Sequence, residues 1–224
     1  EYSTFAEAQA AAIDVASHTY SVPVQGTLYM QGGRRFISIV LPMEFLFNLT
    51  HRPVPRKKGD PNPDPSETRN RPLNPDHVKD ISLYVRKNDT YLIPPVIMSV
   101  HAPLDIFTLM PSEHGVRPCM IVLPKYEALY VTDGQHRIEG LRSAIAEKPE
   151  LHQDAVGITI IEEMDLQRIH QDFYDAAQTK KLEPSLLVEY DGRSFGNALT
   201  RFIIENVPLF AQRTERIGNT IGKN

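Results

Sequence analysis

The residues best suited to chemistry form one short run, Asp133-Gly134-Gln135-His136-Arg137. A guanidinium such as that of Arg137 can donate two parallel hydrogen bonds to a phosphate group. Histidine titrates close to neutral pH, so His136 can act as a general base or donate to a phosphate. The Asp133 carboxylate suits Mg²⁺, which proteins hold through oxygen atoms together with the phosphates that it neutralises. The run therefore predicts a phosphate site.

Each member of the run has a predicted role. Asp133 and His136 are the candidate catalytic residues, and Asp133 is also the candidate metal ligand. Gly134, Gln135, His136 and Arg137 are the candidate nucleotide- or phosphate-binding residues, and Gln135 is also suited to orient a water molecule or contact a base edge. In the structural alternative, Asp133 only caps a helix, Arg137 only pairs with a neighbouring carboxylate, and His136 only packs.

The elements on either side of the run position it. Residues 128–132 have the pattern of a buried strand, and residues 138–147 have that of a helix. Asp133 stands where a helix N-cap is expected, and Gly134 permits a sharp turn or the close approach of a ligand. The N–H groups of the first helical turn then point at one spot and favour an anion there.

A second basic feature is the proline-rich stretch 52–75, which contains seven prolines and shows no hydrophobic period. A long segment of this kind is usually functional or disordered. The functional interpretation is a loop that contacts DNA phosphates, and the structural alternative is a solvated loop. The candidate DNA-binding residues are Arg56, Lys57, Lys58, Arg69 and Arg71.

Periodicity and turn signals predict alternating elements along the rest of the chain. The Asn74-Pro75-Asp76 sequence is typical of a helix start, and Gly32-Gly33 is typical of a hairpin turn. Further strands are predicted at 20–30, 34–41, 92–100, 105–110, 120–123 and 156–162, and further helices at 5–17, 42–48, 165–177 and 197–206. Strands and helices without strict alternation predict the α+β class.

The predicted domain organisation has three parts. Residues 1–19 form an N-terminal helix or arm, residues 20–195 form the main domain, and residues 196–224 begin a helical C-terminal part. The single cysteine, Cys119, excludes an internal disulfide and is expected to pack as a small apolar residue.

Composition limits the classes of partner. The chain has 224 residues and a net charge of −4, so DNA binding would have to come from a local basic patch. No apolar stretch reaches the length of a membrane span, no secretory signal opens the chain, and a cytoplasmic location is expected. No histidine spacing typical of a zinc site is present.

Around the run, the string VTDGQHRIEGL at residues 131–141 resembles the signature of the DGQHR-domain proteins, whose best-described members are the bacterial DndB-type regulators of DNA phosphorothioation. Other landmarks agree in order. They are RPLN at 71–74, YLIPPVI at 91–97, SLLVEYDGR at 185–193, NVPLF at 206–210 and RTE at 213–215. The resemblance spans residues 20–224.

The resemblance implies a mixed sheet with flanking helices related to the ParB and sulfiredoxin group. In that group a turn after a strand holds phosphates, and ATP or GTP with Mg²⁺ is the implied cofactor. DNA, either modified or of the operator, and the DNA-modification enzymes are the implied partners, and homo-oligomerisation is left open. A related branch serves 7-deazaguanine modification of DNA.

One stretch departs from the family pattern. The family has Phe-x-Asp-Leu-Asn after a helix, whereas FYDAAQTKK at residues 173–181 places Ala177 where the asparagine would fall. Gln178 is the candidate substitute amide and Lys180 the candidate positive charge, both as further phosphate-binding residues. The alternative for Lys180 is a solvated helix end.

Three functions remain open from the sequence. The first is a regulator of DNA phosphorothioate modification that binds, and in one version hydrolyses, a nucleotide with Mg²⁺ at the DGQHR turn. The second is a non-catalytic DNA-binding repressor of the modification operon. The third is a ParB-like nuclease with Asp133 as metal ligand.

Overall fold

The computed structural model describes residues 1–51, 72–100, 102–110, 115–126, 129–178, 183–211 and 213–216. The chain divides into two compact units, Glu1–Ala177 and Gln178–Asn224. The sequence predicted a boundary at residues 195/196 instead. The structure divides the chain earlier because the helix 184–190, which the sequence did not predict, belongs with the C-terminal helix.

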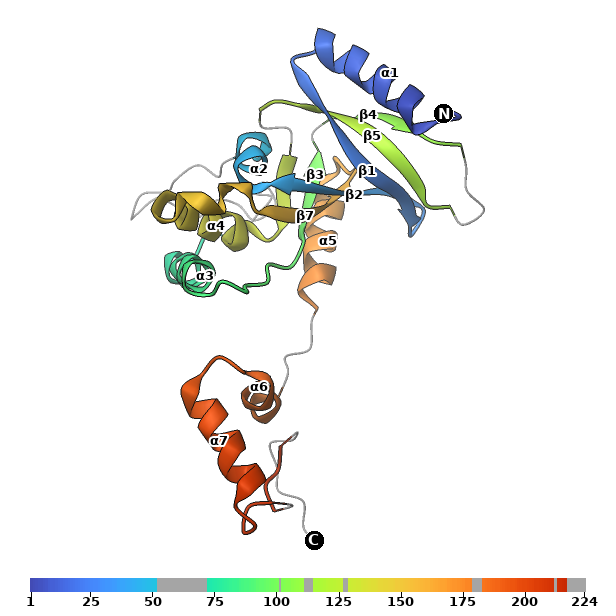
Figure 1. Cartoon of the computed structure of the whole chain (residues 1–224). Helices are drawn as coiled ribbons and strands as arrows, with labels where there is room; N and C mark the ends of the chain where they lie inside the picture. The colour runs from blue at the N-terminus through green and yellow to red at the C-terminus, as the bar shows by residue number, and fades with distance from the viewer. Residues whose placement is uncertain are drawn as a thin grey trace. The chain divides into compact units, whose positions relative to one another are not determined.

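The first unit is a seven-stranded sheet with flanking helices (Figure 1). The strand order is β4-β5-β1-β2-β7-β3-β6, with only the β3–β7 pair parallel among these neighbours. The strands are β1 (Ser21–Gln31), β2 (Arg34–Pro42), β3 (Val96–Val100), β4 (Asp105–Thr108), β5 (Arg117–Pro124), β6 (Leu129–Asp133) and β7 (Ala155–Ile161). The helices are α1 (Phe5–His18), α2 (Met43–Leu49), α3 (Pro75–Lys87), α4 (Gln135–Glu147), the 3-10 turn η1 (Pro149–Gln153) and α5 (Leu166–Ala177). The predicted α+β class with a mixed sheet is confirmed, while the relation to the ParB and sulfiredoxin group stays a prediction.

Local sequence explains several of these elements. Gly32 and Gly33 have φ of +57° and +75°, which is the geometry of the two-residue hairpin turn between β1 and β2. Asn74 caps α3 by accepting the N–H of Asp76 at 3.0 Å, and Pro75 occupies the first helical position, as predicted.

The sheet curls. Pro124 and Leu129 end β5 and begin β6, and five residue steps reach at most about 18 Å. These strands are second and seventh in the sheet, so a flat sheet would separate them by about 24 Å. The curl therefore brings the start of the edge strand β6 toward the far side of the sheet.

The two faces of the sheet carry different helices. On β5, Ile121 lies in the main core, which also takes side chains from α2, α3 and α4. Met120 and Val122 point to the opposite face and pack against Ala12 and Ala16 of α1. Figure 1 shows α1 on this side of β5. The predicted N-terminal helix thus packs on the sheet.

The second unit contains α6 (Pro184–Tyr190) and α7 (Phe195–Asn206), and the helix predicted at 197–206 is confirmed. Arg201 Nη1 joins the two helices by donating to the carbonyl oxygens of Glu189 at 2.7 Å and Asp191 at 2.9 Å. Neither helix buries a residue within the part of the chain that the structure describes, and Phe195 is 82% exposed.

Candidate functional site

The predicted phosphate site is a strand–turn–helix, as the sequence indicated. β6 ends at Asp133 and α4 begins at Gln135, three residues earlier than predicted. The N-cap is Gly134, with φ +104°, so the prediction that Asp133 caps the helix is wrong. A Cβ on Gly134 would lie 2.6 Å from Val96 Cγ1 and 3.0 Å from Arg137 Nε. Only glycine can adopt this φ with neighbours so close, so Gly134 takes the N-cap position. Asp133 is therefore the last residue of the strand.

Asp133 and Arg137 face each other across the turn. Arg137 Nη2 donates to Asp133 Oδ2, and Nη1 donates to the carbonyl oxygens of Pro94 at 3.2 Å and Pro95 at 2.9 Å. The side chains are 20% exposed for Arg137 and 37% exposed for Asp133. The guanidinium thus ties the turn to the segment that enters β3. Arg137 therefore pairs with a neighbouring carboxylate, as the structural alternative predicted. A phosphate bound here would have to share the guanidinium with Asp133.

His136 points into the protein rather than into solvent. The residue is 6% exposed, and its Nε2 accepts the backbone N–H of Asn74 at 2.9 Å. An accepting Nε2 carries no proton, so the ring is the neutral tautomer with its proton on Nδ1. The His77 ring lies edge-on at 5.1 Å. His136 therefore positions the start of α3, and its catalytic role stays a prediction.

The helices α3 and α4 pack unusually closely behind the turn. A Cβ on Gly140 would lie 2.5 Å from Ile81 Cγ2, so the absence of a side chain lets α4 approach α3. Gln135 is also buried, at 8% exposed, which places it against protein rather than on an open surface that could contact a base edge. The sequence signal for this close packing was a glycine in the middle of a helix.

The residue before the basic segment contacts the start of β6, and the residue after it lies beside the turn. Before it, the His51 N–H donates to Leu129 O at 2.9 Å, and the His51 ring lies 4.9 Å from that of Tyr130 on β6. After it, Asn74 is bonded to His136. The structure thus holds both flanking residues on the strand and helix of the DGQHR run. The predicted DNA-binding residues Arg56, Lys57, Lys58, Arg69 and Arg71 lie outside the described residues.

The sequence proposed two further phosphate-binding candidates, Gln178 and Lys180. Gln178 is exposed and is the first residue of the second unit. Lys180 lies outside the described residues. Both assignments stay predictions.

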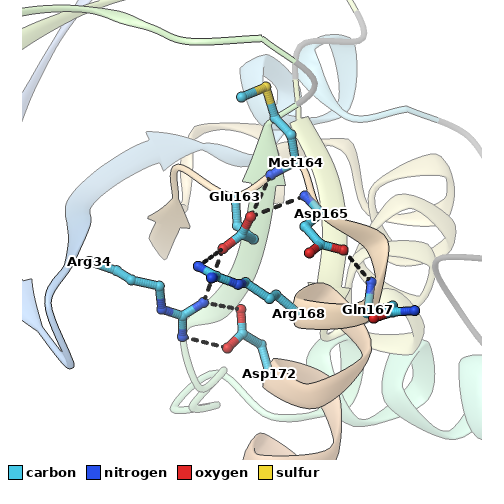
Figure 2. A network of polar contacts seen from close by, with 7 residues as sticks. All are labelled: Arg34, Glu163, Met164, Asp165, Gln167, Arg168 and Asp172. Atoms are coloured by element: carbon cyan, nitrogen blue, oxygen red, sulfur yellow. Dashed lines mark hydrogen bonds and ion pairs between the residues drawn. The ribbon is translucent and has the colours of Figure 1, made fainter.

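A separate charged network fastens α5 to β2 within the first unit (Figure 2). Arg34, at the start of β2, donates to both carboxylate oxygens of Asp172 at 2.6 Å and 2.9 Å. Glu163 lies 3.6 Å from both Arg34 and Arg168, and the side chains of Glu163 and Asp172 are each 11% exposed. The hydrogen bonds to Asp172 raise the pKa of Arg34. Both arginines pair with carboxylates, which indicates that the network holds α5 in place.

The described residues at the turn include two groups that attract an anion, beside the carboxylate of Asp133. They supply one guanidinium and one helix N-terminus, and both are suited to an anion. Within the described ranges, no group of three or more His, Cys, Asp or Glu residues is arranged to hold a metal ion. Asp133 as a Mg²⁺ ligand therefore stays a prediction carried by a single carboxylate.

None of the helices in the described part of the chain has the length and hydropathy needed to cross a membrane. Comparison with curated proteins and with solved structures found no match. The model of one family, DndB, described as DNA-sulfur modification-associated, matches residues 24–224. This match covers most of the chain and includes the strand, turn and helix of the DGQHR run. The chain therefore belongs to the DndB family of proteins associated with DNA sulfur modification.

Proposed function

We propose that this protein is a regulator of DNA sulfur modification that binds DNA through backbone phosphates at the DGQHR turn and along the adjacent basic segment. The observation that carries the proposal is the position of His51 and Asn74. His51 is bonded to the first residue of β6 and Asn74 to the helix after the turn, so the segment between them starts at the far end of β6 and ends beside the turn. Five of its six arginine and lysine residues are the candidate DNA-binding residues, and these are suited to phosphate contacts.

Charge supports a local interface rather than a general attraction to DNA. The chain carries a net charge of −4, and Asp133 partly neutralises Arg137. A DNA phosphate at the N-terminus of α4 would compete with the Asp133 carboxylate for the guanidinium. Binding should therefore be moderate in affinity and should weaken steeply as salt rises, because each phosphate contact releases counterions.

The test is fluorescence anisotropy with a labelled duplex from the promoter of the modification operon, across a range of salt concentrations. Arg137→Ala should weaken binding at least about fivefold and lower the slope of log K against log salt by about 0.9, the value for one phosphate contact. Arg86→Ala is the matched control, because Arg86 also pairs with one carboxylate, that of Glu147, and its side chain is 25% exposed. Equal binding by wild type and Arg137→Ala, with both folded, would refute the role of the turn.

A nucleotide-hydrolysing regulator is the second candidate, and the pairing of Asp133 with Arg137 favours it. A phosphate with Mg²⁺ would satisfy both side chains, the cation at Asp133 and the phosphate at Arg137. In this version Asp133 and His136 are the catalytic residues, and Gln178 and Lys180 provide further phosphate contacts. Bound ATP or GTP with Mg²⁺ would supply a phosphoryl group open to hydrolysis.

Release of phosphate from ATP or GTP, measured with and without phosphorothioate DNA, tests this version. Turnover in wild type that disappears in Asp133→Asn would support it, whereas turnover that Asp133→Asn retains would refute it. Nicking of supercoiled DNA in the same samples would indicate the nuclease instead. Co-purification of the modification enzymes with wild type but not with Arg137→Ala would indicate that these enzymes bind at the DGQHR turn.

A further inference from the structure

Two exposed tyrosines lie side by side at one end of the sheet, away from the DGQHR turn. Tyr20 directly precedes β1 and Tyr126 follows β5, and the pairing of Ser21 with Pro124 brings them together. Tyr20 is 63% exposed and Tyr126 is 62% exposed. Their ring centroids are 5.7 Å apart, the rings are inclined by 30°, and the hydroxyl oxygens are 3.3 Å apart. The pair forms an aromatic surface that faces solvent.

The backbone of Tyr20 is strained. Its φ of +48° is the only positive value for a non-glycine residue in the described part of the chain. A bulky side chain rarely adopts this conformation, which is costly and tends to occur at functional sites. Packing offsets little of this conformational free-energy cost, because most of the Tyr20 side chain is exposed to solvent. Its carbonyl oxygen accepts the Lys125 N–H at 3.2 Å, which helps to hold the conformation.

A cation lies against this surface. Lys125 Nζ lies 4.6 Å from the centroid of the Tyr20 ring, at the distance of a cation–π contact. The hydrogen bond with Tyr20 raises the pKa of Tyr126, so the Tyr126 phenol stays uncharged at neutral pH. An ammonium beside two aromatic rings suits a ligand that combines a flat aromatic ring with a negative charge. A nucleotide within a strand has both properties, because its base stacks and its phosphate pairs with a cation.

We propose that Tyr20, Tyr126 and Lys125, named here the tyrosine platform, bind single-stranded nucleic acid by stacking an unpaired base. Bases in a duplex are stacked on each other, so the platform selects strands that are open, as at a nick or a melted site. The platform is separate from the DGQHR turn, since Lys125 and Tyr126 precede β6 and the turn follows it. The inference therefore does not depend on the proposed function of the turn.

The test measures binding of a labelled short oligothymidylate to the full chain at low salt. Tyr126→Ala should raise the Kd about tenfold, because stacking one base on an aromatic side chain contributes an effect of this size. Tyr174→Ala is the matched control, since Tyr174 is 58% exposed on α5, and its Kd should stay within twofold of wild type. Tyr126→Phe retains the ring and should also stay close to wild type.

A second variant separates binding from folding. Tyr20→Gly removes the ring and also relieves the positive φ, so its Tm should equal or exceed that of wild type while its Kd rises about tenfold. A lower Tm for Tyr20→Gly would show that the pair serves stability and would overturn the proposal. Absence of oligothymidylate binding by wild type, or an equal loss in Tyr174→Ala, would overturn it as well.

Discussion

Replacing Gly134 by alanine tests the geometry of the DGQHR turn directly. The φ of +104° costs an alanine about 1–3 kcal/mol. The added methyl would lie 2.6 Å from Val96 Cγ1, and overpacking of this kind costs about 1–3 kcal/mol. The free energy of unfolding should therefore fall by roughly 2–6 kcal/mol, a large part of the roughly 5–15 kcal/mol that is usual for a folded protein.

Substitutions at two other glycines separate the cost of the positive φ from the cost of overpacking. Gly32 has φ +57° but nothing within 4 Å of its missing Cβ, so Gly32→Ala should cost only about 1–2 kcal/mol of backbone strain. Gly140 lies within a helix, and its missing Cβ would lie 2.5 Å from Ile81 Cγ2. Gly140→Ala should therefore lower the free energy of unfolding through overpacking, and the higher helix propensity of alanine should offset about 1 kcal/mol of that loss.

The assay is urea unfolding followed by circular dichroism, with the slope against urea checked for each variant. Gly134→Ala should be the most destabilised of the three. Val96→Ala introduced together with Gly134→Ala should cost less than the sum of the single changes, because it removes the clashing methyl. A loss for Gly134→Ala no larger than that for Gly32→Ala, or strict additivity with Val96→Ala, would refute the close approach at the turn.

Three further outcomes follow from the described contacts. His136→Ala should lower the free energy of unfolding by about 1–3 kcal/mol, because the Asn74 N–H loses its acceptor, and α3 should exchange its amide protons faster; unchanged exchange would contradict the contact. Arg34→Ala leaves the carboxylate of Asp172 without its bidentate partner, so hydrogen exchange should accelerate in α5 and not in α1. Burial raises the pKa of Cys119 to about 11, so the native protein should not react with a thiol reagent at pH 8, whereas urea-unfolded protein should. The same shift means that stability is full below the usual thiol pKa and falls as pH rises toward 11, which alkaline unfolding would measure.

Some of the candidate site could be predicted from residues close together in sequence. The strand before Asp133, the glycine turn and the helix after it follow from local patterns. The same patterns assigned the N-cap to Asp133, because aspartate is a favourable N-cap residue. They could not show that Val96 lies close to the backbone of Gly134. The Asn74 cap was predicted correctly, but its bond to His136, 62 residues later, was not.

The sequence by itself determined most of the strands and helices, although it did not predict the helix 184–190. These choices depend on side-chain spacing, proline and glycine conformation, and capping within a few residues. Only the tertiary structure decided which distant residues bond to each other. Arg137 donates to the carbonyl oxygens of Pro94 and Pro95, and Arg34 donates to Asp172, which is 138 residues away. The physical reason is that such pairs are set by strand order and the curl of the sheet, which bring together residues whose local preferences carry no information about each other.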